Sequence, residues 1–243
     1  MRPENRHPGH STATGGVVDY RLGKLDRLGL INGAWLDCGC ADGGYAAALV
    51  RRGATSVVGI DVIPERIECA SARWAAVKEL SFAVASADRM PFADASFDRI
   101  LLNEVLEHVE DEVGALREMR RVLIPSGYLV VFSPNRWFPF EGHGLLGPIR
   151  MPFPVPLVPW LPQRPLARWL QARNYWPHEL RGLVARAGFR VVAVDFALPL
   201  FERVQWLPAA IHRFYRRNFA LFERYKLVRR FGVSTLVVGQ RQQ

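Results

Sequence analysis

The chain has 243 residues, of which 49% are hydrophobic, and a formal net charge of +9. This composition can fill the core of one domain with an elaboration, and no apolar run approaches the length of a membrane-spanning helix. Three cysteines, two of them two residues apart, fit neither a disulfide framework nor zinc-ligand spacing. We therefore expect a reducing, cytoplasmic location and no metal.

Residues 1–16 are polar and rich in Gly, Pro and His, without the apolar core of a signal peptide. We expect them to be a mobile N-terminal tail, followed by a single domain at 17–243.

The first informative pattern is a short apolar strand, 34–38, that carries an acid, Asp37, and runs through small residues into a helix. Backbone amides at such a turn can hold a ligand against the main chain. A second acid, Asp61, closes the strand at 56–60, at the spacing where nucleotide-binding units place a carboxylate on ribose hydroxyls. The pattern Gly39-x-Ala41-x-x-Gly44 approximates a dinucleotide fingerprint, so the turn alone leaves the identity of the nucleoside ligand open.

A second interpretation takes the turn as Asp37-x-Gly39-x-Ala41-x-Gly43. This pattern resembles the first motif of class I S-adenosylmethionine-dependent methyltransferases, although Ala41 stands where glycine is commoner. The segments 86–109 and 116–133 resemble the middle of the same family, in its ubiquinone/menaquinone-methylase-like (type 11) branch. The resemblance covers about 33–133 closely and resumes more loosely at 176–189. Several motifs in order favour a methyltransferase over a dinucleotide enzyme.

Apolar periodicity predicts an alternation of strands and helices, which is typical of a largely parallel sheet covered on both faces. The expected strands lie at 34–38, 56–60, 82–85, 97–102, 127–133, 189–196 and 233–239, and the expected helices at 43–52, 64–79 and 111–123. The fold class is α/β. The resemblance implies a Rossmann-like methyltransferase fold, with a seven-stranded, mostly parallel sheet whose last strand is antiparallel.

The resemblance implies S-adenosylmethionine as cofactor, with its methionine part on the glycine turn and its ribose on Asp61. The acid expected near adenine has no clear counterpart, because Ser86 stands at the aligned position and Asp88 two residues on. His108 is interpreted as a structural histidine. The implied cofactor residues are Asp37, Gly39, Cys40, Ala41, Gly43, Asp61, Val62, Ala87, Asp88 and Asn103.

Residues 134–176 form a long insert that holds nine of the 17 prolines and many aromatic residues. Long loops in compact domains are commonly lids or binding elements, and in related methyltransferases this position builds the acceptor pocket. We expect Trp137, Phe138 and His143 to line that pocket. His143, flanked by glycines, is the candidate general base if one is used.

The second half of the chain is strongly basic, with 17 Lys or Arg against five Asp or Glu in residues 134–243. A basic amphipathic helix is expected at about 208–230. Its apolar stripe consists of Ile211, Phe214, Tyr215, Phe219 and Phe222. We expect this stripe to dock on its own domain; alternatively the helix could lie on an anionic membrane at the inner face or contact RNA. The leading hypothesis is methyl transfer to a small-molecule or lipid-like acceptor. The alternatives are an RNA methyltransferase, disfavoured because no RNA-binding module is evident, and a non-catalytic cofactor-binding or partner protein.

Overall fold

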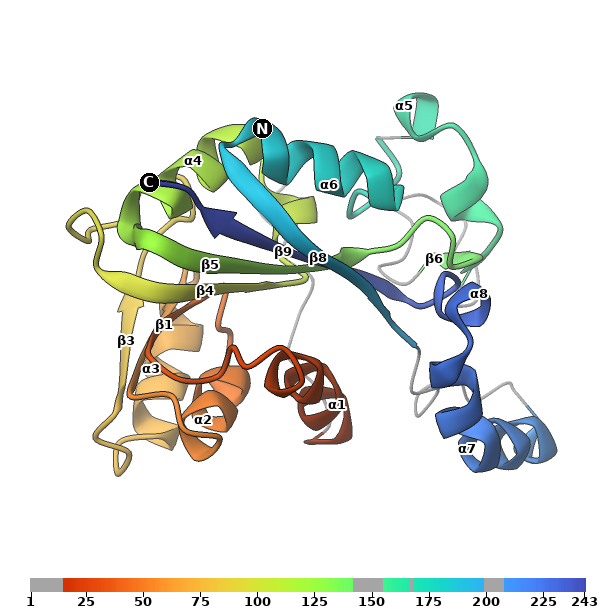
Figure 1. The fold of residues 1–243 in the computed structure, drawn as a ribbon, viewed down its shortest axis with the longest axis horizontal. Helices are drawn as coiled ribbons and strands as arrows, with labels where there is room; N and C mark the ends of the chain where they lie inside the picture. Colours follow the sequence, from red (N-terminus) through yellow and green to blue (C-terminus); the bar gives the residue numbers. More distant parts are fainter. Residues whose placement is uncertain (1–14, 142–154, 167, 199–207) are drawn as a thin grey trace.

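The computed structural model describes residues 15–141, 155–166, 168–198 and 208–243. Its centre is a seven-stranded sheet in the order β3-β2-β1-β4-β5-β9-β8 (Figure 1). The strands are β1 (Ala34–Cys38), β2 (Ser56–Asp61), β3 (Leu80–Val84), β4 (Phe97–Asn103), β5 (Leu123–Pro134), β8 (Phe189–Ala197) and β9 (Ser234–Arg241). The first five strands pair in parallel, and β9 lies between β5 and β8, antiparallel to both. The seven-stranded, mostly parallel sheet predicted from the sequence is confirmed.

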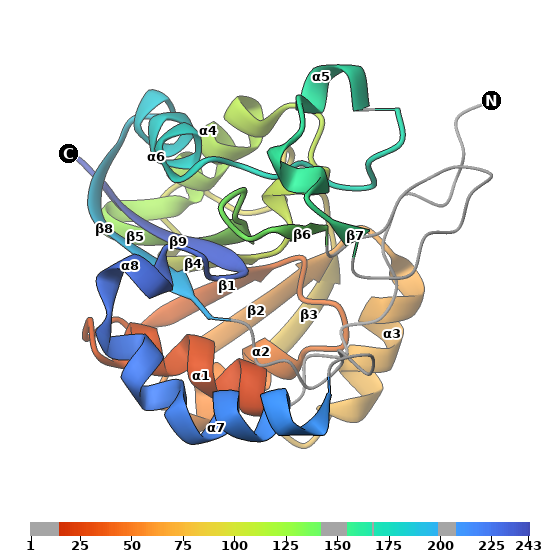
Figure 2. The same cartoon turned by 90° about the vertical axis from the view of Figure 1, so that its right-hand side faces the viewer.

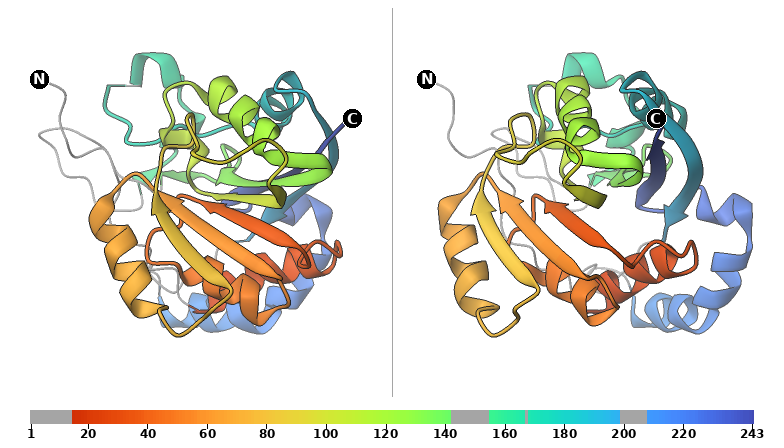
Figure 3. Two further views of the ribbon diagram at one scale, coloured as in Figure 1. Left: turned by 90° about the vertical axis from the view of Figure 1, so that its left-hand side faces the viewer. Right: turned by 60° about the vertical axis from the view of Figure 1, so that its left-hand side comes forward.

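Helices cover both faces of this sheet (Figures 1 and 3). The helices are α1 (Gly15–Asp26), α2 (Gly44–Arg51), α3 (Pro64–Arg73), α4 (Glu112–Val122), α5 (Gln163–Leu166), α6 (Pro177–Arg186), α7 (Ala209–Arg224) and α8 (Lys226–Arg229), with 3-10 turns η1 (Leu106–His108) and η2 (Val158–Trp160). A small hairpin pairs β6 (Phe140–Glu141) with β7 (Val155–Pro156). In Figure 3, α1, α2 and α3 lie on one side of the sheet, and α4 and α6 lie on the other.

Two buried clusters fill the space between the sheet and these helix layers. Successive residues of one strand belong to different clusters, because their side chains point to opposite faces of the sheet. Trp35 belongs to the α1–α2 side, and its neighbour Leu36 to the α4–α6 side. Both are fully buried. This two-sided burial explains why the early strands have nearly continuous apolar sequences.

The largest differences from the predicted boundaries concern α1, α3, β5 and the C-terminal helix. Helix α1 was not predicted, and because it begins at Gly15 it overlaps the end of the expected tail; residues 1–14 lie outside the described residues. Helix α3 ends at Arg73 rather than 79, where the Trp74 indole donates a hydrogen bond to the Asp42 carbonyl. Strand β5 begins four residues early. The helix predicted at 208–230 is broken by extended backbone at Tyr225 into α7 and α8.

The carboxyl ends of β1 to β5 lie at one edge of the sheet, called the carboxyl edge below. Because β9 runs antiparallel to β5 and β8, the connection from β8 to β9 also lies at this edge. The insert leaves from the same edge, where β5 ends at Pro134. In open sheets of this kind, ligands bind beyond the carboxyl ends of the strands. Among the helices that the structure describes, none is long and apolar enough to cross a membrane.

Candidate functional site

The turn between β1 and α2 is fixed by backbone hydrogen bonds and by left-handed residues. The amides of Gly39 and Cys40 both donate to the Ile60 carbonyl, at 2.7 and 2.9 Å. Gly39 and Gly43 have φ of 76°, and Ala41 has φ of 47°. This conformation costs a residue with a Cβ about 1–3 kcal/mol. The position where the family commonly has glycine thus takes a glycine-like conformation in this chain too.

The two glycines are also required by their protein neighbours. A Cβ on Gly39 would lie 2.4 Å from Cγ2 of Val105, and one on Gly43 would lie 2.7 Å from the ring of Phe82. The side chains of Val105 and Phe82 therefore pack against the backbone of these glycines, and this contact excludes larger residues whether or not a ligand is bound. Cys40 is buried beside the turn as a free thiol.

Asp61, at the end of β2, joins the turn to the second strand. Its carboxylate accepts hydrogen bonds from the amides of Ala41, at 3.1 Å, and Ile63, at 3.0 Å. Arg66 lies 3.5 Å from the same carboxylate. A carboxylate has about four acceptor positions, so Asp61 retains capacity for ligand hydroxyls.

Asp37 is the most perturbed acid of the turn. The pKa of Asp37 is raised to about 7. Burial is the main cause of this rise, the hydrogen bond from the Ala46 amide opposes it, and the charge of Asp61 adds to it. Its Oδ2 atom is buried and has no hydrogen-bond partner among the described residues. A buried carboxylate oxygen without a partner is unfavourable. The site therefore favours a ligand that brings a cation or hydrogen-bond donors to Asp37.

Asn103, at the end of β4, belongs to a network that sequence reasoning missed. Arg21 of α1 donates to the Asn103 amide oxygen and forms an ion pair of 2.8 Å with Glu104. The same guanidinium donates to Ser234 Oγ at the start of β9, at 2.6 Å. Glu104 has a positive φ of 57°, an uncommon conformation for a residue that is not glycine. Three segments far apart in the sequence therefore meet where β4 ends.

Glu107 is a buried acid next to Glu104 of this network. Its side chain is buried and accepts a hydrogen bond of 3.0 Å from Ser133 Oγ. Burial raises the pKa of Glu107 well above its ordinary value, and the nearby charge of Glu104 raises it further. His108 ends the short η1 turn next to it.

The remaining predicted residues differ in exposure. Val62 is exposed beside Asp61, and Ala87 is buried. Asp88 is exposed and accepts a hydrogen bond from Ser86 Oγ, so these two polar side chains form one small cluster after β3.

The predicted acceptor residues are only partly described. Trp137 is 40% exposed, and its ring packs edge-on against Trp176 and Phe231. Phe138 is half-buried, with its ring 5.5 Å from that of Phe140. His143 lies outside the described residues. No group of three or more potential metal ligands occurs among the described residues.

Comparisons with known proteins agree with this geometry. Residues 36–131 match the family model described as "Methyltransferase domain". Over 120 residues, the chain is 38% identical to demethylmenaquinone methyltransferase of Beutenbergia cavernae, covering 47% of this chain and 49% of that protein. Over 101 residues, it is 36% identical to norajmaline N-methyltransferase of Rauvolfia serpentina, covering 40% and 35% of the two chains. The matched region thus spans half or less of each of these relatives.

The solved structures extend the likeness over nearly the whole chain. The crystal structure of an S-adenosylmethionine-dependent methyltransferase from Mesorhizobium loti aligns with a TM-score of 0.62 and 16% identity, covering 93% of this chain and 99% of that one. The fold is therefore the Rossmann-like fold of class I methyltransferases. Residues 36–131 are thus similar in sequence to methyltransferase domains, including that of a menaquinone-pathway methyltransferase, and this similarity implies S-adenosylmethionine as the cofactor.

The geometry of this chain fits that cofactor. S-adenosylmethionine has an ammonium group, which suits the unpartnered oxygen of Asp37, and ribose hydroxyls, which suit the remaining acceptor positions of Asp61. The turn between them carries small residues at positions 39, 41 and 43.

Proposed function

We propose that this protein transfers the methyl group of S-adenosylmethionine to a small, lipid-like acceptor. The observation that carries the proposal is the pair of buried acids at the ends of β1 and β2, on either side of a left-handed glycine turn. One of these acids, Asp37, has an oxygen that no described group satisfies.

The residues of the chain would mainly bind and orient. When bound, the cofactor supplies a methyl group that its sulfonium has already activated, so the protein need only align a nucleophile and exclude water. In this proposal Asp37 accepts hydrogen bonds from the cofactor's ammonium, and Asp61 accepts them from the ribose hydroxyls. The segment from Asn103 to Val105 packs against the turn, because the Val105 side chain lies where a Cβ on Gly39 would be.

In the proposed reaction, the acceptor atom would form a bond to the methyl carbon as the bond from that carbon to sulfur breaks. The acceptor's proton would pass to a base or to solvent, with S-adenosylhomocysteine as the second product. His143 remains the proposed base if one is used. Trp137 and Phe138 remain the proposed walls of the acceptor pocket.

Two features support a small organic acceptor. The relatives' names give demethylmenaquinone and norajmaline as acceptors of those proteins. In this chain, the insert brings aromatic side chains to the carboxyl edge, where apolar walls would suit a ligand with rings or an aliphatic chain. We also propose that the protein works in the cytoplasm, at the inner face of the membrane, where such acceptors concentrate.

The proposal is tested with cofactor labelled in its methyl group. The protein is incubated with demethylmenaquinol, with a total lipid extract, and separately with tRNA, and label is measured in the organic and RNA fractions. We expect label in an organic fraction, with release of S-adenosylhomocysteine. The matched controls are Asp37→Asn, which should lose transfer, and the exposed-acid variant Glu68→Gln, which should keep it. Label in the RNA alone would overturn the proposal in favour of RNA methylation.

A further inference from the structure

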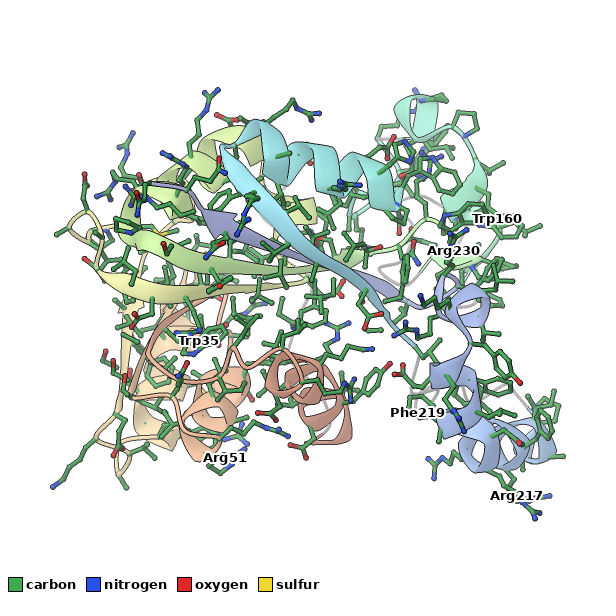
Figure 4. The ribbon with its side chains drawn as sticks, in the orientation of Figure 1. Trp35, Arg51, Trp160, Arg217, Phe219 and Arg230 are labelled. Carbon is green, nitrogen blue, oxygen red and sulfur yellow. The ribbon has the colours of Figure 1, made fainter. Side chains whose placement is uncertain are left out.

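Helix α7 is attached to the body of the protein along one face. The ring of Phe219 packs edge-on against Tyr20 of α1, with centroids 5.3 Å apart. Glu223 accepts hydrogen bonds from the Tyr20 hydroxyl and from Lys24. No residue of α7 is buried (Figure 4 shows Phe219 and Arg217 on this projecting helix). The helix is thus held by a few contacts and presents most of its surface outward.

The outward surface of α7 and α8 is unusually apolar. Phe214 is 62% exposed and Leu227 is 72% exposed. The exposed large apolar residues of this segment are Ile211, Phe214, Leu221, Tyr225, Leu227, Val228 and Phe231. Isolated exposed apolar residues are normal, but a dense group within one short segment marks an interaction surface. We call residues 209–231 the α7–α8 surface.

This surface is also strongly basic. Its seven Lys or Arg residues stand against a single acid, Glu223, which is engaged with α1. The basic residues are Arg213, Arg216, Arg217, Arg224, Lys226, Arg229 and Arg230. Arg229 forms an ion pair of 2.8 Å with Asp195. Arg213, Arg216, Arg217 and Arg224 are exposed.

The basic and apolar residues of α7 lie on adjacent flanks. Residues four apart are neighbours on a helix, so exposed Arg217 borders exposed Leu221, which follows Phe214 by two turns. A helix with an apolar flank beside an Arg-rich flank is typical of helices that lie in a membrane interface. Four of the seven exposed apolar residues are aliphatic, which suits acyl chains, whereas single-stranded RNA is bound mainly by aromatic stacking.

The α7–α8 surface lies at the carboxyl edge of the sheet, as does the candidate cofactor site. It occupies the connection from β8 to β9, and the insert leaves from the neighbouring end of β5. The Trp137 ring lies 5.8 Å from that of Phe231, and the Asn135 amide donates to the carbonyls of Arg230 and Gly232. Figure 2 views the molecule from the side on which α5, α7 and α8 lie, and Figure 4 shows Trp160 and Arg230 on this side.

We propose that the α7–α8 surface seats the protein on an anionic phospholipid membrane. The exposed apolar side chains enter the interface, and the surrounding arginines pair with lipid phosphates. Trp160 of the insert is exposed on the same side of the molecule (Figure 4), and with its exposed neighbour Leu161 it would extend the contact. The membrane contact is inferred from the α7–α8 surface alone. Only the role of that contact, which is to deliver a lipid-like acceptor to the site, rests on the proposed function.

The test is sedimentation of the full chain with vesicles of phosphatidylcholine alone or mixed with phosphatidylglycerol. We expect binding to the anionic vesicles that weakens as salt rises, because exposed charges are screened over about 10 Å at 0.1 M salt. Arg216→Glu with Arg217→Glu should weaken binding by about tenfold or more, since each basic residue near an anionic surface contributes roughly 1 kcal/mol. The matched control, Arg27→Glu with Arg51→Glu, reverses two exposed charges on α1's end and α2, away from this surface (Arg51 in Figure 4), and should bind as the native chain does.

A second pair of variants tests the apolar contribution. Leu227→Ser should weaken vesicle binding severalfold, whereas Leu28→Ser, at a residue 46% exposed after α1, should not. Equal binding to neutral and anionic vesicles, or unchanged binding of the Arg216/Arg217 variant, would overturn the proposal. Salt-sensitive binding of tRNA without vesicle binding would overturn it in favour of RNA.

Calorimetry with S-adenosylmethionine on the same preparations separates this inference from the proposed function. Cofactor binding without vesicle binding overturns the membrane surface and leaves methyl transfer standing. Vesicle binding without cofactor binding supports the surface and overturns the function.

Discussion

Asp37→Asn should make the ligand-free protein more stable at pH 8 while weakening its binding of S-adenosylmethionine. The carboxyl group is buried, and its pKa is raised from the ordinary 3.8 to about 7. A tenfold change in proton affinity corresponds to about 1.4 kcal/mol, so this displacement corresponds to about 4 kcal/mol. An acid whose pKa is higher in the folded state contributes stability below pH 4 that is lost as pH rises through about 7.

The amide removes this ionisation but adds an N–H donor that needs a partner, which costs about 1–3 kcal/mol if it has none. We therefore expect a net gain of roughly 1–3 kcal/mol at pH 8, and a smaller dependence of stability on pH between 4 and 7. The exposed-acid variant Glu68→Gln is the matched control and should follow the native curve.

The assay is urea unfolding at several pH values between 4 and 8, with and without S-adenosylmethionine. The native protein should gain more stability from the cofactor than the Asp37→Asn variant does, because the ligand's ammonium compensates the buried charge. A variant less stable than the native chain at pH 8 without ligand would show that the Asp37 carboxylate does not destabilise the fold. A variant with undiminished cofactor affinity would show that Asp37 does not bind the cofactor.

Three further predictions concern the same edge of the sheet. Asp61→Ala should weaken cofactor binding by about 1–3 kcal/mol in calorimetry, and unchanged affinity in a folded variant would remove Asp61 from the site. Ala41→Gly should stabilise the protein by about 1 kcal/mol in urea unfolding, because Ala41 holds a positive φ; a loss of stability would contradict the strain. Arg21→Met should destabilise the protein by about 3–5 kcal/mol, because it leaves Glu104 without its guanidinium, and a change below 1 kcal/mol would show that the pair is dispensable.

The sheet could be predicted from the sequence because its signals are local. Each early strand is a short apolar run, and Pro64 marks the start of α3 at the expected position. The ends of elements were less predictable where tertiary contacts set them. The hydrogen bond from Trp74 to the Asp42 carbonyl joins α3 to the glycine turn, and no local pattern announces it.

Helix α1 was missed because its first residues, Gly15 and Gly16, are poor helix formers. Its stability comes from packing, since Leu22 and Leu25 are fully buried. The role of Arg21 was missed for a related reason. Its partners Glu104 and Ser234 lie 83 and 213 residues away, and a spacing pattern does not report such contacts.

The amphipathic character of α7 was predicted, but its packing was not. The sequence placed Phe214 on the same stripe as Phe219, and self-docking was the favoured expectation. In the structure, Phe219 contacts Tyr20, whereas Phe214 remains 62% exposed. Helical periodicity shows which residues share a face, but the width of the contacted face depends on the partner surface.

Calorimetric titration of the purified protein with S-adenosylmethionine, and separately with NAD, measures which of the two nucleoside ligands the glycine turn binds. The acids at the ends of β1 and β2 predict binding of S-adenosylmethionine with a Kd on the order of micromolar, and weak or no binding of NAD. Tighter binding of NAD than of S-adenosylmethionine would exclude S-adenosylmethionine as the cofactor of this site.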